Sequence, residues 1–208
     1  MIITDISEQK KKGRYNLFVD GEFFSGIDAF AVVHHGLKVG LEIDQDRIEE
    51  LVFESETRSC FDKVINILSV PRSRKEIIDK LKKYSYSQRV VDASIRKAEE
   101  YGYINDKDYA KMLVSSKKLK SKLEIKKSLF EKGISSSIAS AELEKIDEEE
   151  EKARALVLSE KYLKNKQIDK KTLSGLYAFL LRKGFGTEVA MHALRKFKSE
   201  EIEDYGGD

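Results

Sequence analysis

Lysine and arginine side chains gather in two stretches of this chain, and they are the residues whose type and spacing could do chemistry. Residues 72 to 97 hold nine Lys and Arg against three acids, and residues 111 to 132 hold eight Lys against two Glu. Such clusters favour a polyanion or an acidic protein groove as partner. A solvated helix surface is the alternative, and for any single lysine it is the better interpretation. The candidate binding residues are Arg72, Arg74, Lys75, Lys117, Lys118, Lys120, Lys122, Lys126, Lys127, Arg182 and Lys183.

Catalytic and metal-binding patterns are missing from the sequence. It has no phosphate-cradling glycine loop, no GxSxG elbow and no zinc-ligand spacing. His34 and His35 are adjacent, so a helix would point them about 100° apart, which does not suit a shared metal. Cys60 stands in an apolar helical pattern and is expected in a core. The acids of Asp147 to Glu151 suit a helix start. We therefore expect a protein that is not an enzyme and has no cofactor.

Two sequence patterns that mark helix starts each occur twice in the chain, 48 residues apart. Ser73 is followed three positions later by Glu76, and Ser121 by Glu124, which is the capping-box pattern. Ser87 and Ser135 have the same offset, and each precedes an amphipathic run. The free amides at the start near Ser121, among the lysines, also favour anions. The matching starts predict a repeated structural unit.

A third copy follows at an offset of 51 residues, with Thr172 in the place of Ser121. The further matched positions are Leu180, Gly184, Phe185, Val189 and Leu194, which correspond to Leu129, Gly133, Ile134, Ile138 and Leu143. Each unit is expected to hold three helices: one ahead of the cap (Phe61 to Leu68, Tyr109 to Lys118, Lys152 to Leu163), one after it, and one after the glycine turn. Gly133 and Gly184 suit the left-handed position that closes a helix.

The fold class that follows is mainly α, with tandem three-helix repeats forming an elongated curved array. Ahead of them, the turn signals Lys12-Gly13 and Asp20-Gly21 separate β-rich runs and predict a small antiparallel β meander. A short helix is expected from Asp28 to a stop at Gly36. The predicted parts are residues 1–55, three repeats at 56–104, 105–146 and 147–198, and an acidic tail at 199–208. Residues 1–56 carry a net charge of −6, and the remainder +8.

Four tyrosines lie among the bases, and their rings could stack nucleobases: Tyr84, Tyr86, Tyr101 and Tyr103. Tyr86 aligns with Ile134 and Phe185 of the later copies, so it is better interpreted as an interior anchor.

One segment, "KAEEYGYINDKDYAKMLV", joins the first repeat to the second. Together with "LSVPRSRKEIIDKLKKY" before it and "IKKSLFEKGIS" after it, it closely resembles the RecX family of bacterial regulatory proteins. The resemblance covers roughly Cys60 to Phe197, and "GRYNLFVDGEFFSGI" looks like the β-rich extension of some members. Locally, Gly102 would end a helix, Tyr103 and Ile104 would dock the link, and Asn105 or Asp106 would cap the next helix. Ser85 and Gly175 depart from the family turn glycine and capping Glu.

The resemblance implies a modulator of the RecA recombinase, mostly inhibitory, that binds RecA as monomer and as filament on single-stranded DNA. It would lower RecA ATPase, strand exchange and coprotease activity. Single-stranded DNA is an expected partner and double-stranded DNA a further one; the protein itself is expected to be a cytoplasmic monomer without membrane contact. The alternative is a stand-alone nucleic-acid-binding helical repeat protein, which would bind DNA strongly without RecA.

Overall fold

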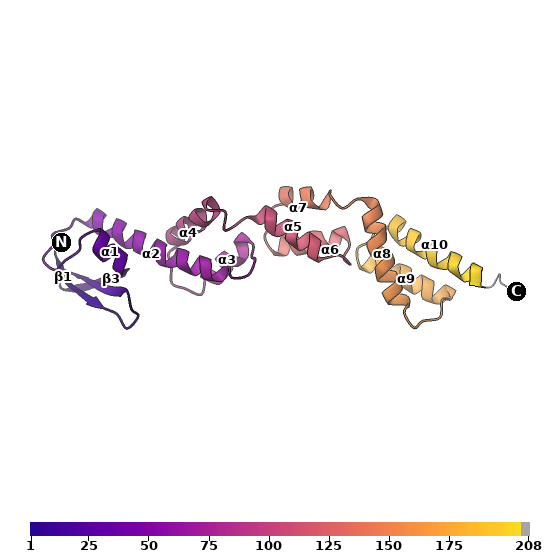
Figure 1. The fold of residues 1–208 in the computed structure, drawn as a ribbon, viewed down its shortest axis with the longest axis horizontal. Coiled ribbons are helices and arrows are strands. Elements are labelled where there is room, and N and C mark those ends of the chain that lie inside the picture. The colour runs from indigo at the N-terminus through magenta and orange to yellow at the C-terminus, as the bar shows by residue number, and fades with distance from the viewer. Residues whose placement is uncertain (205–208) are drawn as a thin grey trace. The chain divides into compact units, whose positions relative to one another are not determined.

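The computed structural model describes the backbone of residues 1–204 and the side chains of residues 1–198. The chain forms two compact units, one from Met1 to Asn105 and the other from Asp106 onwards (Figure 1). As predicted, it is mainly helical with one small N-terminal sheet. Within the described part, no helix combines the length and the apolar character that crossing a membrane requires.

The N-terminal sheet is the predicted meander. Its strands are β1 (Ile3–Glu8), β2 (Arg14–Val19) and β3 (Glu22–Asp28), paired antiparallel in the order β1-β2-β3. Val19 pairs with Glu22, so Asp20 and Gly21 form the connecting turn. Both have positive φ, at 49° and 87°, as the tightest hairpin turn requires.

Two helices cover this sheet. Helix α1 (Ala29–His34) begins after its N-cap Asp28, and Gly36 follows its end with φ +61°, as predicted. Helix α2 (Gln45–Ile67) follows. The shared core is apolar and includes Ile3, Leu17, Val19, Ile27, Ala31, Leu37, Ile48 and Leu51.

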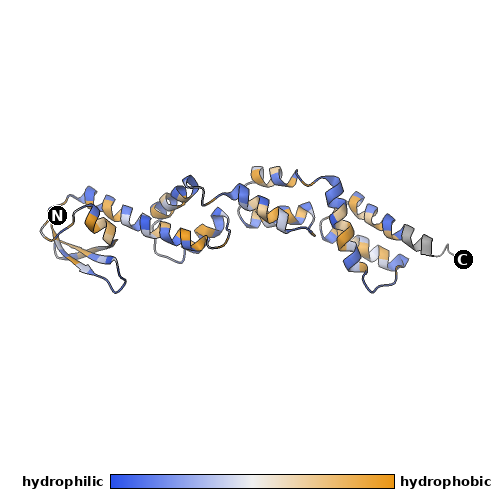
Figure 2. Cartoon of the chain, in the orientation of Figure 1, coloured by the Kyte–Doolittle hydropathy of each residue, from blue (hydrophilic) through white to orange (hydrophobic). Residues whose placement is uncertain are grey.

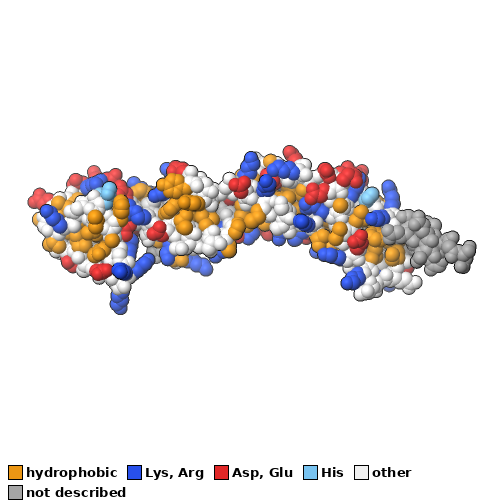
Figure 3. Space-filling model, in the orientation of Figure 1, with side chains coloured by type: hydrophobic (Ala, Val, Ile, Leu, Met, Phe, Trp, Pro, Cys, Tyr) orange, Lys and Arg blue, Asp and Glu red, His pale blue; other side chains and the backbone are white. Residues whose placement is uncertain are grey.

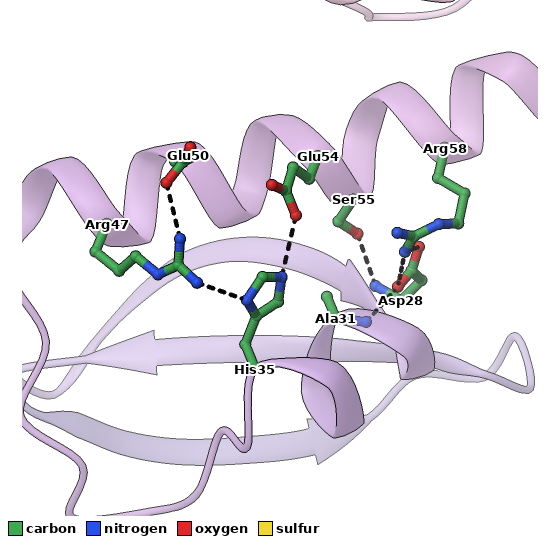
Figure 4. Close-up of polar contacts among 8 residues, drawn as sticks. All are labelled: Asp28, Ala31, His35, Arg47, Glu50, Glu54, Ser55 and Arg58. Carbon is green, nitrogen blue, oxygen red and sulfur yellow. Dashed lines mark hydrogen bonds and ion pairs between the residues drawn. The ribbon is translucent and has the colours of Figure 1, made fainter.

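Asp28 ties the end of the sheet to α2 (Figure 4). Its carboxylate accepts the amide of Ala31 at 2.7 Å and two bonds from Arg58 Nη1 at 3.0 and 2.9 Å. Its own amide donates to Ser55 Oγ at 2.8 Å. The N-cap of α1 is therefore also an anchor to α2.

His35 makes a second tie to α2. Arg47 Nη2 lies 3.0 Å from His35 Nδ1, and Glu54 Oε2 lies 3.1 Å from Nε2 (Figure 4). Arginine only donates, so Nδ1 accepts and the proton of the neutral ring sits on Nε2, which donates to Glu54. His34 is exposed and stacks on Phe30 at 4.8 Å between ring centroids. The two histidines thus have separate surroundings.

The first three-helix set consists of the end of α2, α3 (Arg74–Leu81) and α4 (Gln88–Glu100). Its core includes Cys60, Val64, Ile77, Leu81, Val90, Val91, Ile95, Ala98 and Ile104. Cys60 is fully buried, as expected. The helix predicted from Phe61 to Leu68 is the last part of the much longer α2, which also runs unbroken past the predicted boundary at residue 55.

The second unit contains two further sets. One is α5 (Asp106–Ser116), α6 (Lys122–Glu131) and α7 (Ser136–Leu143), and the other is α8 (Glu148–Leu163), α9 (Lys170–Arg182) and α10 (Thr187–Asp204). Each has its own apolar cluster. These helices carry both apolar and polar residues along their length (Figure 2), which is typical of helices with one buried face. Of the predicted acidic tail, only the backbone to Asp204 is described, and it belongs to α10.

Most predicted caps and turns are confirmed. Ser73 and Glu76 form the full capping box of α3, and Ser87 and Ser135 cap α4 and α7. Ser121 accepts the amide of Glu124 at 3.2 Å. Three predicted turn glycines lie at positive φ: Gly102 at 71°, Gly133 at 76° and Gly184 at 82°.

The cap predicted at Thr172 is wrong. Asp169 caps α9, and its carboxylate accepts the amide of Thr172 at 2.7 Å. Thr172 is therefore the third residue of the helix, because the alignment placed the helix start three positions too late. The hydrogen bonds that the Asp169 carboxylate accepts from the backbone and side chain of Thr172 lower the pKa of this carboxyl group.

Candidate functional site

The eleven candidate residues fall on both units. The first basic surface, defined as Arg72, Arg74 and Lys75, lies at the start of α3 in the first unit. The middle basic surface comprises the remaining eight candidates, on the second unit: Lys117, Lys118, Lys120, Lys122, Lys126, Lys127, Arg182 and Lys183. Figure 3 shows basic, acidic and apolar side chains interspersed on the face in view.

Two members of the first basic surface already have partners within the protein. Arg72 Nε donates to the carbonyl of Ile67 at 3.1 Å, which holds the α2–α3 loop. Arg74 Nε lies 2.9 Å from Glu99 Oε1, and both side chains are about half exposed. An exposed pair of this kind contributes little to stability, but it places the start of α3 beside the end of α4.

The lysines of the middle basic surface are held loosely. Lys118, Lys126 and Lys127 are exposed. Lys120 Nζ lies 3.9 Å from Glu124, and Lys122 Nζ lies 3.9 Å from Glu151. Ion pairs of this length are weak. The ammonium groups of both lysines therefore remain available to an anionic partner.

A hydrogen bond between two repeats brings the parts of this surface together. Ser121 Oγ donates to the carbonyl of Lys183 at 2.6 Å while it accepts the amide of Glu124. Ser121 is fully buried at this contact. Residues 62 positions apart in the sequence thus become neighbours, with the end of α9 against the start of α6. Arg182 is exposed at that end, and Lys183 Nζ lies 5.8 Å from the ring centroid of Phe179.

Gly184 makes this contact sterically feasible. Its φ of 82° already favours glycine. A Cβ at this position would lie 2.9 Å from Ser121 Oγ and 3.1 Å from Leu123 Cβ, which is too close. The glycine is therefore required both by the turn and by the approach of α6.

Arg154 and Glu151 also connect the two repeats, although neither is among the binding residues predicted from the sequence. Arg154 is 7% exposed; it donates to the carbonyls of Lys117 at 3.3 Å and Lys120 at 3.2 Å, and pairs with Glu150 at 2.6 Å. Glu151 accepts the amide of Lys122 at 3.2 Å. The acidic run does begin a helix, as predicted. Two of its members, Glu150 and Glu151, also take part in these contacts between the second and third repeats, here called the junction.

The expectation that the α6 start favours an outside anion is wrong for two of its amides. The amide of Lys122 donates to the Glu151 carboxylate, and that of Glu124 donates to Ser121 Oγ. The protein's own groups satisfy these two donors, so they are not available to an outside anion.

An apolar groove of about 370 Å³ adjoins the middle basic surface. It lies between α6 and α7 and is lined by Lys122, Leu123, Lys126, Ser140, Leu143 and Glu144. Leu123 is 49% exposed there. Basic and apolar groups therefore occur side by side. Among the described residues, no group of three or more His, Cys, Asp or Glu side chains is arranged to hold a metal ion.

Comparison with known proteins gives concordant matches. The family model described as "Regulatory protein RecX N-terminal domain" matches residues 1–44. Regulatory protein RecX of Clostridium beijerinckii is 33% identical over 98% of this chain and 99% of its own length. That of Bacillus cereus is 31% identical over 98% of this chain and 79% of its own length.

Solved structures agree with these sequence matches. A crystal structure of regulatory protein RecX superposes with a TM-score of 0.70 and 25% identity, covering 92% of this chain and 98% of that one. The crystal structure of RecX from Lactobacillus salivarius gives a TM-score of 0.62 at 25% identity, over 69% of this chain and 97% of that one.

Proposed function

Because the chain belongs to the RecX family of regulatory proteins, we propose that it acts on the RecA recombinase, the partner that membership of this family implies. The relatives are named as regulatory proteins and not as enzymes. Near-complete coverage of both chains at 33% identity is the observation that carries the proposal.

In this proposal the protein binds RecA, and RecA filaments on single-stranded DNA. It lowers RecA ATPase, strand exchange and coprotease activity, and so restrains recombination, DNA repair and the SOS response. Binding the filament requires a surface that meets both protein and nucleic acid.

The middle basic surface suits that requirement. Its exposed lysines offer charge to phosphates or to acidic side chains, while the adjoining groove at Leu123 and Leu143 offers apolar area. Clustered cations also speed the encounter with an anionic filament. The first basic surface supplies a second contact on the other unit.

RecA-dependent ATP hydrolysis on single-stranded DNA, measured with and without this protein, tests the proposal. We expect the hydrolysis rate to fall as the protein is added, at salt concentrations where it binds free DNA weakly. An unchanged rate with the protein in excess over RecA at the same salt concentration would contradict the proposal and favour a stand-alone nucleic-acid-binding protein. That alternative also predicts DNA affinity falling steeply with salt.

A further inference from the structure

Three aromatic rings form a cluster at the end of α4, here called the aromatic platform: Phe61, Tyr101 and Tyr103. Their ring centroids lie 5.9 Å apart for Phe61 and Tyr101, 6.3 Å for Phe61 and Tyr103, and 6.0 Å for the two tyrosines. The tyrosine rings are nearly perpendicular to one another, at 89°. In an edge-to-face pair the edge of one ring meets the face of the other, so the neighbouring tyrosine leaves at least one face of each ring uncovered.

Among the described aromatic residues of the repeats, Tyr101 and Tyr103 are the most exposed. Tyr101 is 59% exposed and Tyr103 56%, while Phe185 of the third repeat is 3% exposed. Tyr86, which aligns with Phe185, packs against the first core. Core packing thus accounts for Tyr86 but not for the open rings of Tyr101 and Tyr103.

The backbone holds the platform in place. Gly102 has φ +71° and turns the chain between the tyrosines. The amide of Tyr101 donates to the carbonyl of Lys97 at 3.1 Å, and that of Tyr103 donates to the carbonyl of Ala98 at 2.9 Å. The next residue, Ile104, is buried in the first core. Little ordering is therefore left for a partner to impose on this turn.

Positive charge borders the rings. Lys97 Nζ lies 5.0 Å from the centroid of Phe61 and 5.8 Å from that of Tyr101. The pair between Arg74 and Glu99 brings the first basic surface to the same end of α4. Exposed ring faces beside cations are the two components from which single-strand binding sites are built.

We propose that the aromatic platform stacks the bases of single-stranded DNA, with Lys97 and the first basic surface meeting the phosphates. Every base has a π-face, so the contact is independent of sequence, as a regulator acting along a filament requires. The inference rests on the proposed action on RecA–DNA filaments. It adds a base-contacting site, which the lysine clusters alone do not provide.

The test compares two oligonucleotides of equal length, oligo(dT) and an abasic strand that keeps the phosphates and lacks the bases. Binding of the full chain is measured by anisotropy over a series of salt concentrations that begins at low salt. The double variant Tyr101→Leu with Tyr103→Leu should bind oligo(dT) about ten-fold more weakly. It should bind the abasic strand as wild type does, within about two-fold, with an unchanged salt slope because the phosphate contacts remain.

The variant Tyr101→Phe with Tyr103→Phe keeps both rings and should bind both strands like wild type. Circular dichroism and the melting temperature establish that both variants are folded. If the Leu double variant lost the same affinity for both strands, or lost no affinity for oligo(dT), the proposal would be overturned. Lost RecA inhibition with intact DNA binding would overturn it too and assign the rings to a protein contact. If wild-type protein leaves the rate of ATP hydrolysis by RecA unchanged, the proposed function is refuted instead. The difference in affinity between oligo(dT) and the abasic strand still reports on stacking in that case.

Discussion

Ser121 Oγ donates a 2.6 Å hydrogen bond to the carbonyl of Lys183 and accepts another from the amide of Glu124. One hydroxyl therefore caps α6 and satisfies the end of α9 in the next repeat. The capping role follows from local sequence, but the bond to Lys183 exists only because the repeats dock.

The first prediction concerns this double role. Ser121→Ala removes the cap and leaves a carbonyl without its donor, so it should lower the free energy of unfolding by about 2 kcal/mol. Ser135→Ala, at the exposed cap of α7, should cost about 1 kcal/mol. Denaturant unfolding measures both. Equal losses would show that the contact with Lys183 adds nothing.

Gly184 offers a second test of the junction. Gly184→Ala adds a strained φ and a Cβ 2.9 Å from Ser121 Oγ, so we expect a loss of roughly 2–3 kcal/mol. Gly102→Ala is the matched control, because Gly102 also has positive φ but open space around it. It should cost only about 1 kcal/mol. The opposite ranking in thermal unfolding would mean that α6 and α9 do not meet as described.

Arg154 provides the third prediction. Arg154→Met leaves Glu150 and the carbonyls of Lys117 and Lys120 without their donor. Because Glu150 is about half exposed, water solvates it, and the expected loss is about 2 kcal/mol, less than for a fully buried pair. Arg182→Met, at an exposed position, should change stability by less than about 0.5 kcal/mol. Similar unfolding midpoints for the two variants would refute the structural role of Arg154.

The fourth prediction is a pH dependence from Cys60. Burial raises the pKa of its thiol above the ordinary value of 9.0, with Ser94 partly opposing the shift. Above pH 9 the unfolded chain loses this proton while the folded chain keeps it, so folding becomes less favourable as pH rises. Cys60→Ala lacks this effect, so its stability deficit relative to wild type should shrink between about pH 8 and 10. A stability difference between Cys60→Ala and wild type that stays constant over this pH range would contradict the prediction. Native Cys60 should also resist thiol reagents.

Local signals predicted much of the fold because caps and turns depend on neighbouring residues. Ser73, Ser87 and Ser135 cap as their side chains suggest, and Asp20-Gly21 forms the hairpin turn. Asp169 and Thr172 both suit a cap, and the repeat offset selected the wrong one. The length of α2 follows from a run without Gly or Pro, a local signal that the spacing of the repeats does not contain.

The inter-repeat contacts could not be predicted in the same way. Arg154 looks like an ordinary charged helix residue until the segment between α5 and α6 packs against α8, since its partners are backbone carbonyls of Lys117 and Lys120. Glu151 likewise fits a favourable helix start, and its bond to the amide of Lys122 depends on tertiary packing. Helix periodicity reports which face is buried, but not which repeat covers it.

Charge removal from the middle basic surface tests its proposed role without disturbing the junction. Arg154 and Glu151 contact backbone atoms of Lys117, Lys120 and Lys122, and glutamine retains those atoms. We therefore expect the combined change of Lys117, Lys118, Lys122, Lys126 and Lys127 to Gln to leave the protein folded. A control variant changes five lysines outside this surface, all of them exposed, to Gln: Lys10, Lys11, Lys12, Lys161 and Lys164.

The most direct measurement is RecA ATP hydrolysis on single-stranded DNA in the presence of wild type, the five-lysine variant or the control variant, each shown to be folded. We predict that wild type and the control variant lower the rate, while the five-lysine variant requires at least about ten-fold more protein, since each charge contributes modestly and five act together. A folded five-lysine variant that inhibits RecA as well as wild type would contradict the assignment of this surface.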